Sequence, residues 1–157
     1  MKPYVLHAGE GAALWFLGSR AVVKATGAET QGRLSVAEFV NPAGFATPLH
    51  RHLHEDEMFY VLSGTAEFRC DGESLLAGAG DFVLLPAGLA HGFVVGAEEP
   101  LRALQLTTPG GFEKFVAEVG EPATGPGLPP EVTPVDPVLL GHAAARHGIE
   151  LLGPPLR

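Results

Sequence analysis

The chain has 157 residues, of which 46% are hydrophobic and 18% charged, and its formal net charge is −8 at pH 7. Such apolar content with so little charge excludes a disordered chain. The ten Lys and Arg residues are scattered, so we expect no nucleic-acid partner. A single cysteine, Cys70, cannot form an internal disulfide, and this predicts a cytoplasmic protein. The longest uncharged stretch, residues 82–97, is too short and too interrupted to span a membrane.

Short strands are predicted for the first two-thirds of the chain. The 21 glycines and 14 prolines, with ordinary hydrophobicity, favour strands joined by tight turns. Apolar or β-branched runs bounded by turn residues predict strands at 14–17, 21–25, 34–40, 57–62, 66–70, 74–77, 81–85, 92–95 and 101–107. We therefore expect one all-β barrel domain over residues 1–108.

The composition changes at Pro109. Apolar residues recur at helical spacing in FEKFVAEV, which predicts a helix over 112–119. Six prolines and three glycines between residues 120 and 137 argue against any regular element there. The pair Asp136-Pro137 predicts the start of a second helix that runs to about His147, and the last residues are extended. Residues 109–157 are thus expected to be an extension that packs on the barrel or on a partner.

The first segment that carries chemistry contains closely spaced histidines. His50 and His52 are two residues apart, so on a strand both rings leave the same face. Glu57 has the opposite parity, and it can join them only if the chain turns before the next strand. Two acidic residues of that turn, Glu55 and Asp56, are predicted to be solvated charges.

The second segment runs from Gly80 to His91. Pro86 and Gly88 predict a turn, after which His91 begins a strand whose face it shares with Phe93. Taken alone, a histidine among apolar neighbours is more often a buried core residue than a ligand.

Together the two segments resemble the signature motifs of the cupin superfamily. The matching residues are Gly44, His50, His52, Glu57 and Gly64 in the first motif and Gly80, Pro86, Gly88 and His91 in the second. Val95 stands where the second motif has Asn. The resemblance implies a double-stranded β-helix, that is, a jelly-roll barrel, here with a short helical and proline-rich C-terminal extension.

The resemblance also implies a metal site. In cupins the corresponding side chains bind one divalent metal, and here they are His50, His52, Glu57 and His91. Three imidazoles and a carboxylate suit Fe, Mn, Ni, Co, Cu or Zn and leave positions open for a ligand.

Within the superfamily, the run PLHRHLHEDEMFYVLSG resembles single-domain bacterial quercetin 2,3-dioxygenase-like proteins. In such enzymes the metal binds the flavonol oxygen, and dioxygen opens the ring with loss of carbon monoxide. Glu57 is then the expected catalytic base. Two alternatives stay open: a non-catalytic module that binds a small molecule or a metal, and a metal-dependent isomerase.

Aromatic and apolar residues flank the proposed ligands. Phe45, Phe59, Phe93 and Val95 are candidates for the wall of a substrate pocket. They favour a small apolar or aromatic substrate, and the resemblance implies that this substrate carries an enol or diol group and reacts with dioxygen. By resemblance to small cupins, we also expect a homodimer.

Overall fold

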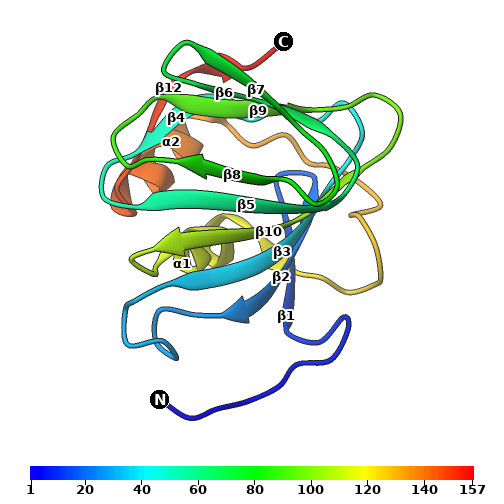
Figure 1. Ribbon diagram of the computed structural model, residues 1–157, viewed down its shortest axis with the longest axis vertical. Helices are drawn as coiled ribbons and strands as arrows, with labels where there is room; N and C mark the ends of the chain where they lie inside the picture. The colour runs from blue at the N-terminus through cyan, green and yellow to red at the C-terminus, as the bar shows by residue number, and fades with distance from the viewer.

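The computed structural model describes residues 1–157, which form two antiparallel β-sheets facing each other (Figure 1). The seven-stranded sheet has the order β11 (Glu121–Pro122), β1 (Ala12–Phe16), β2 (Ser19–Ala25), β3 (Ser35–Asn41), β10 (Leu101–Thr108), β5 (Asp56–Ser63) and β8 (Phe82–Leu85). The five-stranded sheet has the order β12 (Ile149–Pro155), β4 (Pro48–His52), β9 (His91–Val95), β6 (Ala66–Cys70) and β7 (Glu73–Ala77). The predicted all-β jelly roll is confirmed.

Alternation of buried and accessible side chains decides which face of each central strand points into the barrel. Along β3 and β10 every second residue is buried. The two strands pair antiparallel from Leu101 opposite Asn41 to Thr107 opposite Ser35, so their buried faces coincide. One apolar cluster, which includes Phe68, fills the barrel between the two sheets.

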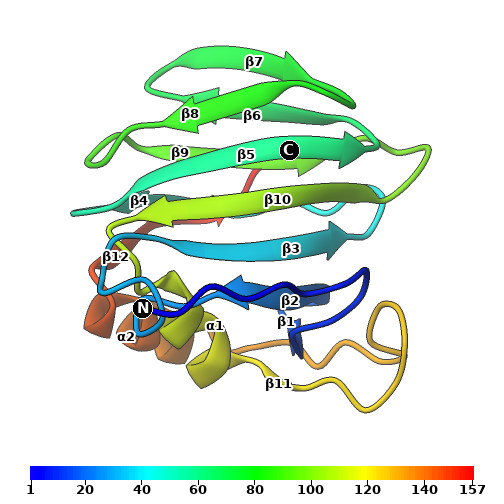
Figure 2. The same cartoon turned by 60° about the horizontal axis from the view of Figure 1, so that its bottom comes forward.

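Two helices close one end of the barrel, as Figure 2 shows. They are α1 (Phe112–Val119) and α2 (Pro137–Arg146), both close to the predicted ranges. The Asp136 carboxylate caps α2 by accepting a hydrogen bond from the Val138 N–H at 2.8 Å. The Arg146 guanidinium donates to Glu118 of α1 at 2.9 Å and so joins the two helices. Neither helix has the length and apolar character needed to cross a membrane.

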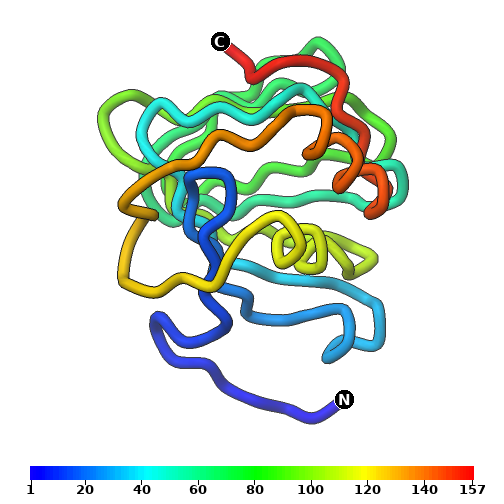
Figure 3. Tube along the Cα trace, turned by 180° about the vertical axis from the view of Figure 1, so that it is seen from behind, coloured from blue at the N-terminus to red at the C-terminus, as the bar shows by residue number.

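The C-terminal extension packs on the barrel of its own chain. Between the helices the chain crosses the back of the barrel (Figure 3). Residues 121–122 nevertheless form the two-residue strand β11, with Leu14 opposite Pro122, so the prediction of no regular element between 120 and 137 was wrong. A proline is tolerated there because β11 is an edge strand that needs few ladder hydrogen bonds. At the other sheet, β12 pairs with β4, which carries His50 and His52.

Candidate metal centre

Four side chains from three strands meet inside the barrel. His50 and His52 come from β4, Glu57 from β5 and His91 from β9. One ligand atom of each lies within 4.8 Å of all the others. His52 and His91 are each 1% exposed and Glu57 is 4% exposed, whereas His50 is half-buried and lines the adjoining cavity.

Two turns bring these strands into register. Strand β4 ends at His52 and β5 begins at Asp56, so the chain turns where the parity of Glu57 requires. Across the β4–β9 pair, His50 stands opposite His91. The N–H of Gly88 donates to the His52 carbonyl at 2.7 Å, with Gly88 at a φ of 81° that favours glycine. This hydrogen bond fixes the second turn against the end of β4.

Backbone carbonyls orient two of the imidazole rings. The Nδ1 atom of His50 lies 2.7 Å from the Pro48 carbonyl oxygen, and that of His91 lies 3.1 Å from the Leu89 carbonyl oxygen. A carbonyl only accepts, so each Nδ1 carries the proton and donates it. In the neutral ring the lone pair is then on Nε2, the atom that remains for the centre.

A carboxylate orients the third ring. His52 Nδ1 donates to Glu55 Oε2 at 2.9 Å, and the Glu55 side chain is only 13% exposed. Asp56 is also engaged, because its Oδ1 accepts from the Ala87 N–H at 2.9 Å. The prediction that Glu55 and Asp56 are solvated turn charges was therefore wrong: folding brings a ring nitrogen and a backbone amide to them. His54, in the same turn, is exposed.

The centre has the donors for a cation. Glu57 Oε2 lies 2.8 Å from His91 Nε2 and 3.6 Å from His52 Nε2. The latter nitrogen is buried and has no hydrogen-bond partner. A lone pair on His52 Nε2 that faces the Glu57 carboxylate without a hydrogen bond is stabilised by a positive charge between the two atoms. Three imidazole nitrogens and one carboxylate oxygen therefore fit a divalent transition metal.

Burial and charge act in opposite directions on the pKa values of these groups. Burial lowers the pKa of His50 to about 4, against the attraction of the Glu57 carboxylate. Burial also acts to lower the pKa of His52, but Glu57 and the hydrogen bond to Glu55 outweigh it and raise that pKa. For Glu57, burial acts to raise the pKa, yet the surrounding imidazoles hold it well below its usual range. The carboxylate is thus ionised.

Gln105 is a site residue that the sequence analysis did not identify. It is 5% exposed on β10, and its Nε2 donates a hydrogen bond to Glu57 Oε1. The available signal was positional, because Gln105 falls in phase with the buried apolar residues Leu101 and Ala103 of the same strand. This hydrogen bond fixes one carboxylate oxygen and leaves the other facing the histidines.

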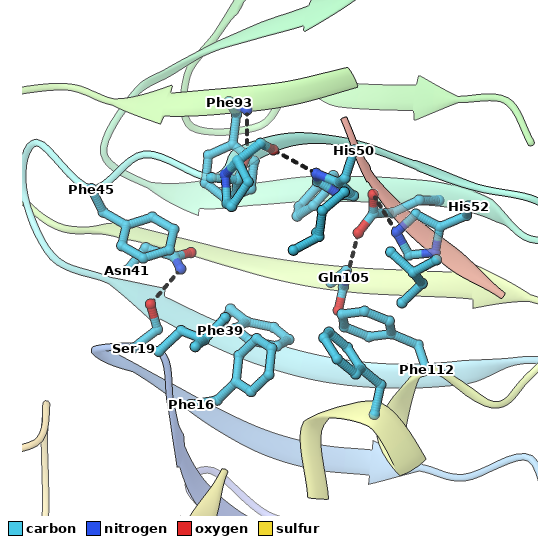
Figure 4. Close-up of a pocket in the computed structure, with 18 of the residues that line it drawn as sticks. Phe16, Ser19, Phe39, Asn41, Phe45, His50, His52, Phe93, Gln105 and Phe112 are labelled. Atoms are coloured by element: carbon cyan, nitrogen blue, oxygen red, sulfur yellow. Dashed lines mark hydrogen bonds and ion pairs between the residues drawn. The ribbon is translucent and has the colours of Figure 1, made fainter. Parts of the chain in front are cut away.

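An aromatic cavity adjoins the four donor side chains (Figure 4). Of the predicted wall residues, Phe45, Phe59 and Phe93 line it. Val95 is not among the lining residues: it is 2% exposed and packs in the core opposite Ala66 of β6, farther along β9 from His91. The C-terminal extension contributes Phe112, Phe115, Leu140, Ile149 and Leu151 to the lining.

Comparison with known proteins relates these features to a family. Residues 38–107 match the family model described as "Cupin domain". Quercetin 2,3-dioxygenase of Bacillus subtilis is 30% identical over 150 residues, which are 96% of this chain but only 43% of that protein. This chain therefore spans less than half the length of that relative.

Solved structures share the fold. A predicted oxalate decarboxylase from Thermotoga maritima superposes with a TM-score of 0.62 at 19% identity, covering 68% of this chain and 99% of that one. An RmlC-like cupin from Shewanella frigidimarina superposes with a TM-score of 0.60 at 20% identity, covering 73% and 97%. At these identities the likeness concerns the fold alone.

Proposed function

Because the chain belongs to the cupin superfamily, we propose that it binds one divalent transition metal through His50, His52, Glu57 and His91 and acts as a quercetinase-like dioxygenase. Its substrate is a small apolar or aromatic molecule with an enol or diol group. The observation that carries this proposal is the position of the donor set, which borders an aromatic cavity instead of a closed core. Such a site can hold a planar ligand and a metal together.

Glu57 is the catalytic base in this proposal. When bound, the metal supplies Lewis acidity toward a hydroxyl oxygen and the electron chemistry needed for dioxygen. The ionised Glu57 accepts the proton of that hydroxyl on a carboxylate oxygen that moves away from the metal position as it does so. The hydrogen bond from Gln105 to Oε1 keeps the carboxylate in the site during this movement.

The lining of the cavity favours an uncharged substrate over a phosphorylated one. It contains no Lys or Arg. Arg51, next to the histidines in sequence, lies outside and pairs with Glu150 at 2.6 Å. A sugar-phosphate isomerase needs cationic groups at the phosphate, so the charges at this site do not support an isomerase that acts on a sugar phosphate.

Dioxygen consumption tests the proposal. The purified protein, reconstituted in turn with each of the six metals, is mixed with flavonols in an oxygen electrode, and carbon monoxide is measured. We expect uptake with at least one metal and a loss of about 100-fold or more in Glu57→Gln. His142→Ala, at an exposed histidine of α2, serves as the control. Flavonol binding without uptake under any metal contradicts the dioxygenase and favours a binding module.

We also propose a homodimer, by resemblance to small cupins, and a cytoplasmic location, from the single cysteine. Tyr60 of β5 and Phe82 of β8 stand opposite each other and are 43% and 61% exposed, with Leu84 beside them at 50%. Adjacent exposed apolar side chains of this kind are typical of interaction surfaces. Light scattering should give twice the chain mass of 16.4 kDa, and a single-chain mass at micromolar concentration contradicts the dimer.

A further inference from the structure

Two buried polar side chains lie in the aromatic cavity away from the metal ligands (Figure 4). Ser19 begins β2 and Asn41 ends β3. Asn41 Nδ2 donates to Ser19 Oγ at 2.7 Å. They are 1% and 4% exposed, and both line the cavity. Phenylalanines surround them, so this pair is a polar spot on an apolar wall.

Hydrogen-bonding capacity remains on this pair. An amide side chain offers two N–H donors and an acceptor oxygen, and a hydroxyl offers one donor and two acceptor positions. The single hydrogen bond between Asn41 and Ser19 uses one donor and one acceptor position. No hydrogen bond of the protein uses the Ser19 hydroxyl as a donor or the Asn41 side-chain oxygen as an acceptor. The Asn41 oxygen is not one of the buried polar atoms that lack a partner, so it retains contact with open space. These groups are therefore available to a ligand in the cavity.

Strand geometry gives the separation of the two polar regions. Gln105, which contacts Glu57, stands opposite Ala37 of β3. Asn41 is four residues farther along β3, which corresponds to roughly 14 Å at about 3.4 Å per residue. Phe39 lies between Ala37 and Asn41 on the same buried face and contacts Phe16 edge to face, with ring centroids 6.3 Å apart. The wall between the polar regions is thus aromatic.

We propose that Ser19 and Asn41 form a second binding subsite, which holds a hydroxyl or carbonyl group at the end of the ligand remote from the metal. The inference rests on the proposed function for the other end of the ligand. With this subsite, the proposed substrates are elongated planar aromatic molecules. They carry a metal-binding pair of oxygens at one end and a hydrogen-bonding group at the other. An amide and a hydroxyl recognise an uncharged polar group without a formal charge on the protein.

Paired probes test the subsite. Binding of 3-hydroxyflavone and of 3,4′-dihydroxyflavone to the metal-loaded full chain is measured by calorimetry for the wild type, Ser19→Ala and Asn41→Leu. We expect the added hydroxyl to strengthen binding to the wild type about tenfold. In both variants the two compounds should bind with about equal affinity. The affinity for 3-hydroxyflavone should stay within about threefold of the wild-type value. Equal increments in wild type and variants, or no binding of either compound, overturn the inference.

A matched control separates recognition from folding. Ser35 is a buried hydroxyl on the same strand as Asn41, hydrogen-bonded to Thr107 at 2.6 Å, and it does not line the cavity. Ser35→Ala should keep the tenfold increment, and its loss there contradicts a local subsite. If Asn41→Leu does not fold, Ser19→Ala alone decides, since it removes one oxygen. Dioxygen uptake is measured separately. Uptake without stronger binding of the dihydroxyflavone contradicts only the proposed subsite. Stronger binding of the dihydroxyflavone without uptake contradicts only the proposed dioxygenase activity.

Discussion

Glu55 contacts the proposed metal centre through the ring of His52. Its carboxylate accepts the Nδ1 proton at 2.9 Å, which fixes the tautomer and the orientation of the ring. We expect Glu55→Ala to weaken metal binding about 10–100-fold in a competition titration. Glu98→Ala removes an exposed carboxylate from a loop and is the control. Equal affinities for the two variants would show that Glu55 does not support the site.

The ease of prediction differed among site residues for a physical reason. His50, His52, Glu57 and His91 lie in two short segments whose spacing is visible in the sequence. Ser19, Asn41, Glu55 and Gln105 take their roles from partners on other strands or across a turn. For Ser19, Asn41 and Gln105 the available signal was a polar residue in phase with buried strand neighbours, and this does not identify the partner. Glu55 lies in a turn between two strands and has no such signal.

At the scale of elements, Gly64 sets the turn between β5 and β6. Its φ is 78°, and an added Cβ would overlap the Pro100 carbonyl oxygen and lie 3.0 Å from Leu101 Cα. Gly72 has a similar φ of 85° but nothing within 4 Å of such a Cβ. We expect Gly64→Ala to lose about 1–3 kcal/mol more free energy of unfolding than Gly72→Ala. Equal losses in chemical denaturation would show that the close approach to Pro100 does not matter.

The elements themselves were predictable where the signal is local. The helix over 112–119 follows from its own apolar period, and Asp136-Pro137 marks the start of the second helix. The pairing of β11 with β1 and of β12 with β4 depends on edges that distant strands leave open. Both segments contain proline, which weakens the strand signal in the sequence. The last residues were expected to be extended, but their pairing with β4 was not predicted.

At the scale of the whole molecule, the C-terminal extension completes the cavity. Ile149 of β12 is 3% exposed and lines it, whereas Leu152 of the same strand is 45% exposed. We expect Ile149→Ala to reduce the free energy of unfolding by about 2–4 kcal/mol and Leu152→Ala by less than about 1 kcal/mol. A thermal or denaturant series measures both. Similar small losses would mean that the extension is not an integral part of the fold.

The central claim is a single divalent-metal site built from His50, His52, Glu57 and His91. The metal content of the purified protein tests this claim most directly. Natively purified wild-type protein and the variants His50→Ala, His52→Ala and His142→Ala are analysed by elemental mass spectrometry. The four-residue site predicts about one transition metal per chain in the wild type and in His142→Ala, and near zero in the other two variants. Equal, near-zero occupancy in all four proteins, before and after metal loading, would contradict it.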